Sequence, residues 1–369
     1  MIELQGEHNT AKIFTVKAEF SAINQIKHLL NQPFMAGSQI RVMPDVHAGM
    51  GCTVGMTMTI TDKVVPGFVG VDIGCAVHVV LLKDKRLDFN QFDKMVHQHI
   101  PAGFNIRSTP HHFKDEIDLA ELKCAKHVDI NRGIYAIGTL GGGNHFIEVG
   151  QDEETQLYLI IHSGSRNLGK QVCEHYQKIA AADMKDRIGA GDRFLAYLEG
   201  DAMENYLHDM RIIQQYADLN RRAIVKELEK QVKFKMIDQF SSVHNYIDFN
   251  TMVLRKGAVS TLKDERIIVP MNMRDGSLLC LGKGNPDWNY SAPHGAGRTM
   301  SRKEAKEQIT LTQYEAAMKG IFSSTVNRNT IDEAPFAYKP MQEIIENSSD
   351  TMTIVKTIKP LYNFKAGKE

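Results

Sequence analysis

The chain has 369 residues, and the 43% that are hydrophobic suffice to bury a large core. Lysine plus arginine and aspartate plus glutamate both number 44, so the net charge is zero and no overall positive field attracts nucleic acid. A nucleic-acid partner would therefore need a local basic groove.

Composition also limits the compartment and the class of site. Five cysteines without a C-x-x-C pair argue against a disulfide framework and against a zinc ribbon. The N-terminal stretch MIELQGEHNT is polar and acidic, unlike a signal peptide, and no apolar run reaches the length of a bilayer span. We therefore expect a cytoplasmic protein without a membrane partner.

Helix and strand patterns alternate along the chain. Apolar residues at helical spacing predict a helix over residues 18–33, ended by Pro33, and residues 39–43 predict a strand that enters a loop at 44–51. The remaining predicted elements are strands at 53–60 and 76–82, a buried strand running into a loop at 157–166, a helix at 166–185, mostly helical structure from 192 to about 235, mixed and strand patterns at 236–249 and 251–261, a strand at 266–270, and a short strand within 352–366.

The organisation favours one domain over residues 1–369. No low-complexity linker or internal repeat divides the chain, and loops with motif-like sequences recur from Asp45 to Lys365, each after a strand. Ser301 and Glu304 fit a capping box, which predicts a helix start. We expect an α+β fold, with mixed sheets and flanking helices, that assembles one site from the whole chain.

Several loops combine side chains of the metal-ligand type with glycines. A lone loop histidine is more often solvated than a ligand, but aspartate, histidine and a thiolate together are the usual ligands of zinc-like or manganese-like ions. One cysteine among them suits a two-metal centre with a bridging thiolate, and such centres suit phosphoryl chemistry. The residues concerned are Asp45, His47, Asp72, Cys75, Asn144, His145, Glu148, His162 and His244.

The segment SAPHGAGRTMSR raises a separate question, because His294 is followed by Gly295, Ala296 and Gly297. A Gly-rich turn entering a helix is the simple interpretation, and bare backbone that a large anion can approach is the functional one. The chain lacks the P-loop pattern and the K-x-D-G motif of lysine-dependent nucleotidyl transfer. Any nucleotide chemistry therefore requires another nucleophile.

The motifs in chain order are DVHAGMGCTVG, VDIGC, GTLGGGNHFIE, HSGSRNLG, HNY and HGAGR. In this order, which covers nearly the whole chain, they resemble the RtcB family of RNA ligases, in a compact, bacterial-type branch. The resemblance implies an enzyme that uses GTP and two Mn²⁺ ions. It implies joining of an RNA 3′-phosphate or 2′,3′-cyclic phosphate to a 5′-hydroxyl end through a histidine–GMP intermediate, in RNA repair or tRNA splicing.

The resemblance also assigns roles to individual residues. His294 matches the histidine that takes GMP, Asp45 an acidic active-site position, and Arg298 a phosphate contact. One metal is assigned to Asp72, Cys75 and His145, and the second to Cys75, His162 and His244. The guanylate contacts are assigned to Asn144, His145, Phe146, Ile147, Glu148, His244, Asn245, Pro270, Met271, Asn272, Met273, Ser277, His294, Gly295, Ala296, Gly297 and Lys365.

The sequence departs from the family pattern at Ala76, where glycine is usual, and at Met271 and Asn272, where a Gly-Ser pair is usual. Two other functions stay open: a metal-dependent RNA phosphodiesterase without GTP use, and an RNA-binding protein without catalysis. An activating protein partner is also left open. The predicted local groove for RNA is formed by Arg166, Arg298, Arg302 and Lys303.

Overall fold

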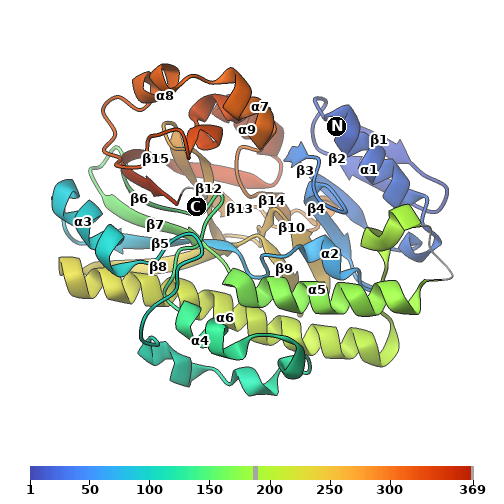
Figure 1. Cartoon of the computed structure of the whole chain (residues 1–369). Coiled ribbons are helices and arrows are strands. Elements are labelled where there is room, and N and C mark those ends of the chain that lie inside the picture. Colours follow the sequence, from blue (N-terminus) through green and yellow to red (C-terminus); the bar gives the residue numbers. More distant parts are fainter. Residues whose placement is uncertain (186–189, 367–369) are drawn as a thin grey trace.

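The computed structural model describes residues 1–185 and 190–366, and its architecture is α+β, as expected (Figure 1). A smaller sheet near the N-terminus and a larger sheet lie beside each other above two long helices. The smaller sheet runs in the order β1 (Ile2–Gln5), β2 (Thr10–Ile13), β3 (Ile40–His47), β4 (Val54–Thr59), β10 (Val253–Lys256) and β9 (Asn245–Asp248).

The larger sheet runs in the order β12 (Arg266–Asn272), β13 (Gly276–Gly282), β15 (Met352–Lys365), β6 (Phe146–Gln151), β7 (Leu157–Ser163), β5 (Ala76–Leu82) and β8 (Met236–Val243). All of its neighbouring strands are antiparallel, and a small third sheet pairs β11 (Ala258–Ser260) with β14 (Ser291–Pro293). The α-helices are α1 (Phe20–Leu30), α2 (Pro66–Val69), α3 (Phe89–His99), α4 (Ile130–Ala136), α5 (Arg166–Asp183), α6 (Gly200–Val232), α7 (Arg302–Gln308), α8 (Leu311–Ala317) and α9 (Met341–Ser348).

Short 3-10 helices occupy several of the connections. They are η1 (Pro33–Met35), η2 (His112–Glu116), η3 (Leu119–Glu121), η4 (Ala125–His127), η5 (Ala190–Leu195), η6 (Pro286–Trp288), η7 (Ile331–Glu333) and η8 (Pro335–Ala337). In the parts of the chain that the structure describes, no helix combines the length and the apolar character that crossing a membrane requires.

Strand β7 shows why the buried run LYLIIHS was readable from the sequence. All of its residues are buried. Leu159 and Ile161 pack on one face against Ile224 of α6, while Tyr158 and Ile160 join a separate cluster on the other face. A central strand covered on both faces reads as a continuous apolar run rather than an alternating one.

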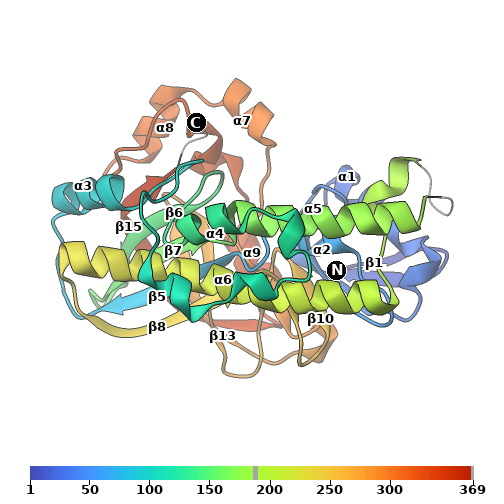
Figure 2. The ribbon, with the colours of Figure 1, turned by 60° about the horizontal axis from the view of Figure 1, so that its bottom comes forward.

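Helix α6 connects the two halves of the molecule. Its first half adds Tyr206 and Ile213 to the core under the smaller sheet, and its second half adds Ile224 and Leu228 to the core under the larger sheet. Figure 2, in which the bottom of the molecule comes forward, shows α6 crossing in front of both sheets with α5 alongside its first part. At 33 residues, α6 is about 50 Å long, which is enough to support both cores.

Most predicted elements are present, including α1, α5 and the capping box of Ser301 and Glu304 at the start of α7. Three expectations are wrong. The loops with Asp72 and Asn144 follow α2 and α4 rather than strands. Residues 44–47 form the end of β3 rather than a loop, because the strand continues past Pro44 through an irregularity in its register with β4. The short C-terminal strand is the 14-residue β15, which continues past Pro360 by a bulge.

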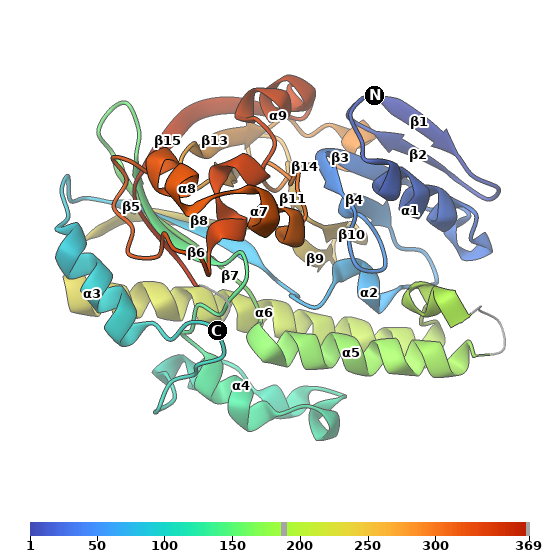
Figure 3. The ribbon, with the colours of Figure 1, turned by 45° about the horizontal axis from the view of Figure 1, so that its top comes forward.

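The C-terminal helices α7, α8 and α9 gather over the side of the larger sheet that holds β12, β13 and β15 (Figure 3). His294, in the segment between β14 and α7, contacts Asp45 of β3 in the smaller sheet and His244, which follows β8 of the larger sheet. The fold therefore brings residues from both sheets to one boundary.

Candidate active site and metal centre

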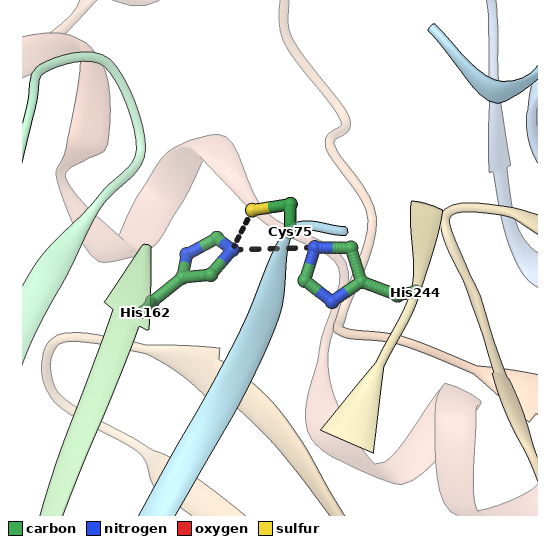
Figure 4. A group of neighbouring side chains, drawn as sticks. All are labelled: Cys75, His162 and His244. Atoms are coloured by element: carbon green, nitrogen blue, oxygen red, sulfur yellow. Dashed lines mark hydrogen bonds between the residues drawn. The ribbon is translucent and has the colours of Figure 1, made fainter. Parts of the chain in front are cut away.

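Strands of the larger sheet bring three predicted ligands to one end of that sheet. Cys75 precedes β5, His162 is in β7, and His244 follows β8. Strand pairing sets Val77 opposite His162 and Ala76 opposite Val243, so the three side chains meet at one level. Cys75 Sγ lies 3.2 Å from His162 Nε2, which in turn lies 3.3 Å from His244 Nε2. Figure 4 shows the three side chains pointing toward one another.

A second group of ligands shares the same sulfur. Asp72, Cys75 and His145 each place one ligand atom within 4.8 Å of the others. His145 Nε2 lies 2.9 Å from Asp72 Oδ2 and 3.4 Å from Cys75 Sγ. Ligand atoms on one tetrahedral ion, with bonds of about 2.0–2.3 Å, stand about 3.3–3.8 Å apart, close to the separations of 3.2 and 3.4 Å from Cys75 Sγ to the two histidine nitrogens. Both groups are therefore compatible with bound metal, and Cys75 belongs to both.

Backbone carbonyls orient the histidine rings. His145 Nδ1 lies 3.0 Å from the Leu140 carbonyl oxygen, and His162 Nδ1 lies 3.2 Å from the Asn144 carbonyl oxygen. An Nδ1–H that donates to a carbonyl leaves the Nε2 lone pair for a cation. Beneath the loops, Arg221 of α6 donates to the carbonyls of Gly74 and Ser163 at 2.7 and 3.1 Å. The ligand loops are thus fixed by α6.

Burial controls the protonation of these side chains. Desolvation holds the pKa of His162 and the pKa of His244 well below the usual histidine range, so both imidazoles are neutral. Desolvation and the charge of Asp72 raise the pKa of the Cys75 thiol. Burial also acts to raise the pKa of Asp72, but the charge of His145 holds it below its usual range. A bound cation would reverse the effect at Cys75, because a coordinating thiol loses its proton.

His294 pairs with Asp45 beside the candidate metal ligands. Its Nδ1 lies 2.7 Å from Asp45 Oδ2, and its backbone N–H donates to the same oxygen at 3.2 Å. The Asp45 side chain is completely buried, whereas 18% of the His294 side chain is exposed. Because Nδ1–H donates to the carboxylate, Nε2 carries the free lone pair. The ring centroids of His294 and His244 are 4.9 Å apart, so this imidazole adjoins the candidate metal centre.

Two glycines follow His294, and the structure gives a different reason for each. Gly297 has a φ of 72°, and a Cβ there would stand 2.3 Å from the Asp45 carbonyl oxygen. Close packing on β3 therefore requires glycine at this position. A Cβ at Gly295 would meet only the Pro270 carbonyl oxygen, at 3.1 Å, and Gly295 lines a cavity. Gly295 is thus the position that leaves bare backbone for a ligand.

A cavity of about 240 Å³ opens beside His294, and we call it the nucleotide cavity. Most of the predicted guanylate contacts line it. They are Asn144, Phe146, Glu148, His244, Pro270, Met271, Asn272, Met273, His294, Gly295, Ala296, Gly297 and Lys365.

Four predicted contacts lie elsewhere. Ile147 belongs to the core with α6, His145 faces the metal ligands, and Ser277 is buried in β13. Asn245 holds the neighbouring loops, because its side chain donates to the Asp72 carbonyl and accepts from the Gly257 N–H.

The structure also places the three residues that depart from the family pattern. Ala76 is the first residue of β5 and is buried, so it continues the strand rather than forming a turn. Met271 packs in a core cluster that includes Ala296. Asn272 caps a tight turn by accepting from the backbone N–H groups of Arg274 and Asp275.

Glu148 and Asn363 place two unsatisfied acceptors in the wall of the nucleotide cavity. Asn363 Nδ2 donates to Glu148 Oε2 at 2.8 Å. Glu148 Oε1 and Asn363 Oδ1 are buried and have no hydrogen-bond partner among the described residues. Burial raises the pKa of Glu148 to about 7, although the Asn363 hydrogen bond and the Lys365 charge act to lower it. Such orphaned acceptors are rare and require an explanation, for which a ligand that donates hydrogen bonds suffices.

We expect Glu148→Gln to remove the loss of stability that the wild type shows as the pH rises. The folded pKa of about 7 lies above the ordinary value of 4.5, so the folded state binds the extra proton and stability falls as pH rises through this window. The wild-type free energy of unfolding should therefore decrease from pH 5 to pH 8. In Glu148→Gln this decrease should be smaller, by up to about 3 kcal/mol. Urea titrations in the presence of chelator measure the free energy of unfolding at each pH, and the exposed Glu121→Gln serves as the control. Equal decreases in all three proteins would contradict the assignment.

The four cations of the predicted RNA groove have different surroundings. Arg166 Nη1 lies 3.1 Å from His145 Nδ1, beside the metal ligands. Arg298 and Arg302 line the nucleotide cavity. Arg298 already donates to two backbone carbonyls at 2.7 and 2.9 Å, and Arg302 is held by two carboxylates at 2.6 Å. The Lys303 side chain is 86% exposed on α7, which favours a solvated role.

Sequence reasoning missed an acidic pair behind the nucleotide cavity. Asp332 and Glu333 of η7 are buried, and Glu333 accepts from Lys365 Nζ at 2.5 Å and from the Tyr338 hydroxyl at 2.6 Å. Burial acts to raise the pKa of Glu333, but the charges of Lys365 and Arg302 hold it at about 2. The segment IDEAPF has no strand before it and no glycine beside its carboxylates, so it carried no signal.

Comparison with known proteins finds one family over nearly the whole chain. The family described as tRNA-splicing ligase RtcB matches residues 25–121 and 110–366. The RNA-splicing ligase RtcB of Escherichia coli strain K12 is 29% identical over 402 residues, covering 96% of this chain and 97% of the relative. The tRNA-splicing ligase RtcB of Aeropyrum pernix is 30% identical over 400 residues, covering 83% of each chain.

Proposed function

Because this chain belongs to the RtcB family, we propose that it is an RNA ligase that joins a 3′-phosphate or 2′,3′-cyclic phosphate end to a 5′-hydroxyl end. The observation that carries the proposal is His294, which the buried Asp45 orients beside both candidate metal groups. We propose RNA repair or tRNA splicing as its process, since its relatives are named for RNA and tRNA splicing.

In this proposal the His294 Nε2 attacks the α-phosphorus of GTP. The N–P bond forms, the bond to the bridging oxygen breaks, and pyrophosphate leaves. Asp45 keeps the proton on Nδ1 and offsets the positive charge that grows on the ring. An oxygen of the RNA 3′-phosphate then displaces His294, and the 5′-hydroxyl of the second strand displaces GMP. A cyclic phosphate is first opened by water.

The donors fit two Mn²⁺ ions. Asp72, Cys75 and His145 would hold one ion, and Cys75, His162 and His244 the other. When bound, these ions would neutralise negative charge on the phosphoryl oxygens. Thiolate and imidazole bind zinc more tightly than manganese, so selectivity must come from geometry and availability, and zinc should inhibit.

Glu148 and Asn363 give a physical reason for the nucleotide cavity to prefer guanine over adenine. Guanine presents N–H donors at N1 and N2, and these suit the free acceptors Glu148 Oε1 and Asn363 Oδ1. Lys365 also lines the nucleotide cavity and supplies a donor for the guanine O6. Adenine has no N–H at N1 and would leave buried acceptors unpaired, which disfavours ATP.

The choice of RNA ends tests this function. Purified protein with GTP and Mn²⁺ should join 3′-phosphate and 2′,3′-cyclic phosphate ends to 5′-hydroxyl ends. It should not join 3′-hydroxyl to 5′-phosphate ends, because no phosphate is then available for guanylylation. An isotopic label on the 3′-phosphate should appear in the new linkage.

The second candidate is a metal-dependent RNA phosphodiesterase, which the two candidate metal groups favour. In that case the protein would open the cyclic phosphate without GTP and without joining the ends. Joining of 5′-phosphate ends alone would contradict both functions.

A further inference from the structure

A second cavity, of about 400 Å³, opens on the same reacting groups. It shares His47, Asn144, His244 and His294 with the nucleotide cavity, and Cys75 also lines it. We call it the side cavity. Since both cavities reach His294, two ligands that occupy them together would meet at this imidazole.

The side cavity has an apolar mouth. Met50, Val71 and Phe194 line it and are 72%, 42% and 48% exposed, respectively. Gly51 allows Phe194 to lie against the loop that carries Met50, because a Cβ on Gly51 would stand 3.1 Å from the Phe194 Cβ. Exposed large apolar side chains gathered around a cavity mark a binding surface.

Hydrogen bonds from two polar side chains, the half-buried Gln177 and the buried Lys256, hold this mouth in place. Gln177 of α5 accepts from the Gly67 N–H at 2.9 Å and donates to the Arg193 carbonyl at 2.7 Å, next to Phe194. Lys256 is buried, and its Nζ donates to the carbonyls of Met50 and Gly67 at 2.9 and 3.2 Å. The mouth is therefore preorganised, which lowers the entropy lost when a ligand binds.

We propose that the side cavity binds the terminal nucleotide of the RNA strand that carries the 3′-phosphate, with its base stacked on Phe194. This rests on the proposed function, in which guanylate fills the nucleotide cavity while the RNA phosphate attacks the phosphorus on His294. In a displacement at phosphorus, the entering group takes the side opposite the leaving group, so the RNA phosphate enters where pyrophosphate left. The side cavity opens on His294 apart from the guanosine and offers an aromatic ring to a base.

The affinity for RNA tests the cavity without any ligation step. Anisotropy of a labelled 3′-phosphorylated oligonucleotide should show that Phe194→Ala weakens binding by roughly ten- to a hundredfold, the range for loss of one base–aromatic stack. Phe194→Tyr should restore binding, because it keeps the ring. Phe104→Ala is the matched control, since Phe104 is 77% exposed and does not line the side cavity, and it should bind normally.

Oligonucleotides that lack one base identify which RNA strand occupies the side cavity. Removing the base next to the 3′-phosphate should weaken binding to the wild type by the same factor, and Phe194→Ala should add nothing to that loss. If the loss instead follows the base at a 5′-hydroxyl end, or if Phe194→Ala binds like the wild type, the proposal is overturned. Failure of the proposed function has a different signature, because the wild type would then take no label from GTP.

Discussion

Replacing His294 by alanine is expected to lower covalent labelling of the protein by α-labelled GTP by at least about a thousandfold. Nε2 of His294 is the free nitrogen of an imidazole whose other nitrogen is held by Asp45, and it borders the nucleotide cavity. The wild-type label should show the acid lability and hydroxylamine sensitivity of a phosphoramidate. Gel autoradiography of matched samples gives the measurement.

Two controls separate loss of the nucleophile from loss of the fold. His8→Ala removes an exposed histidine before β2 and should label normally. His294→Ala should keep its metals, because the candidate ligand groups do not include His294. Asp45→Asn should also label poorly, since the amide can donate to Nδ1 and so select the wrong tautomer. Label that persists in His294→Ala would assign the nucleophile to another residue, with Lys365 the next to test.

Cys75→Ala is expected to lose at least one bound metal and to lower ligation by more than about a hundredfold, without unfolding the protein. The reason is geometric, because the Cys75 sulfur lies 3.2 and 3.4 Å from ligand nitrogens of the two separate groups. Outer partners of metal ligands alone change affinity or activity by about 10–100-fold, so removing a shared ligand should cost more. Atomic absorption after gel filtration measures the metal, and circular dichroism measures the fold.

Cys280→Ala is the matched control for this variant. Cys280 is completely buried in β13 with apolar neighbours, so its loss should leave the metal content unchanged while lowering the melting temperature slightly. Full ligation by Cys75→Ala, or ligation by the wild type in excess chelator, would refute the two-metal assignment.

Three of the candidate metal ligands that the sequence predicted share one property. Cys75, His162 and His244 lie at strand ends and beside short polar or glycine-containing segments, where a scaffold presents functional groups. Such local signals can be read without knowing the fold. Glu333 and Asn363 have no such signal, because their importance comes from tertiary contacts with Lys365 and Glu148.

Strand boundaries also depend on tertiary contacts that the local sequence does not reveal. Pro44 and Pro360 lie within β3 and β15, although proline cannot donate to a strand ladder. In the structure, register irregularities near both prolines let β3 and β15 continue. Whether a proline ends a strand depends on the neighbouring strand's pairing, which local sequence does not contain.

Helix α6 has a consequence for how the molecule folds. Its two halves belong to different apolar cores, and Arg221 and Asn220 between them hold the loops that carry the candidate metal ligands. Neither sheet can detach without exposing one half of the helix, so unfolding of the two sheets is coupled. Contacts such as Asp45 with His294, 249 residues apart, close long loops and are slow to form. We therefore expect the contact between Asp45 and His294 to be among the last made after synthesis, and chains truncated before residue 294 lack it altogether.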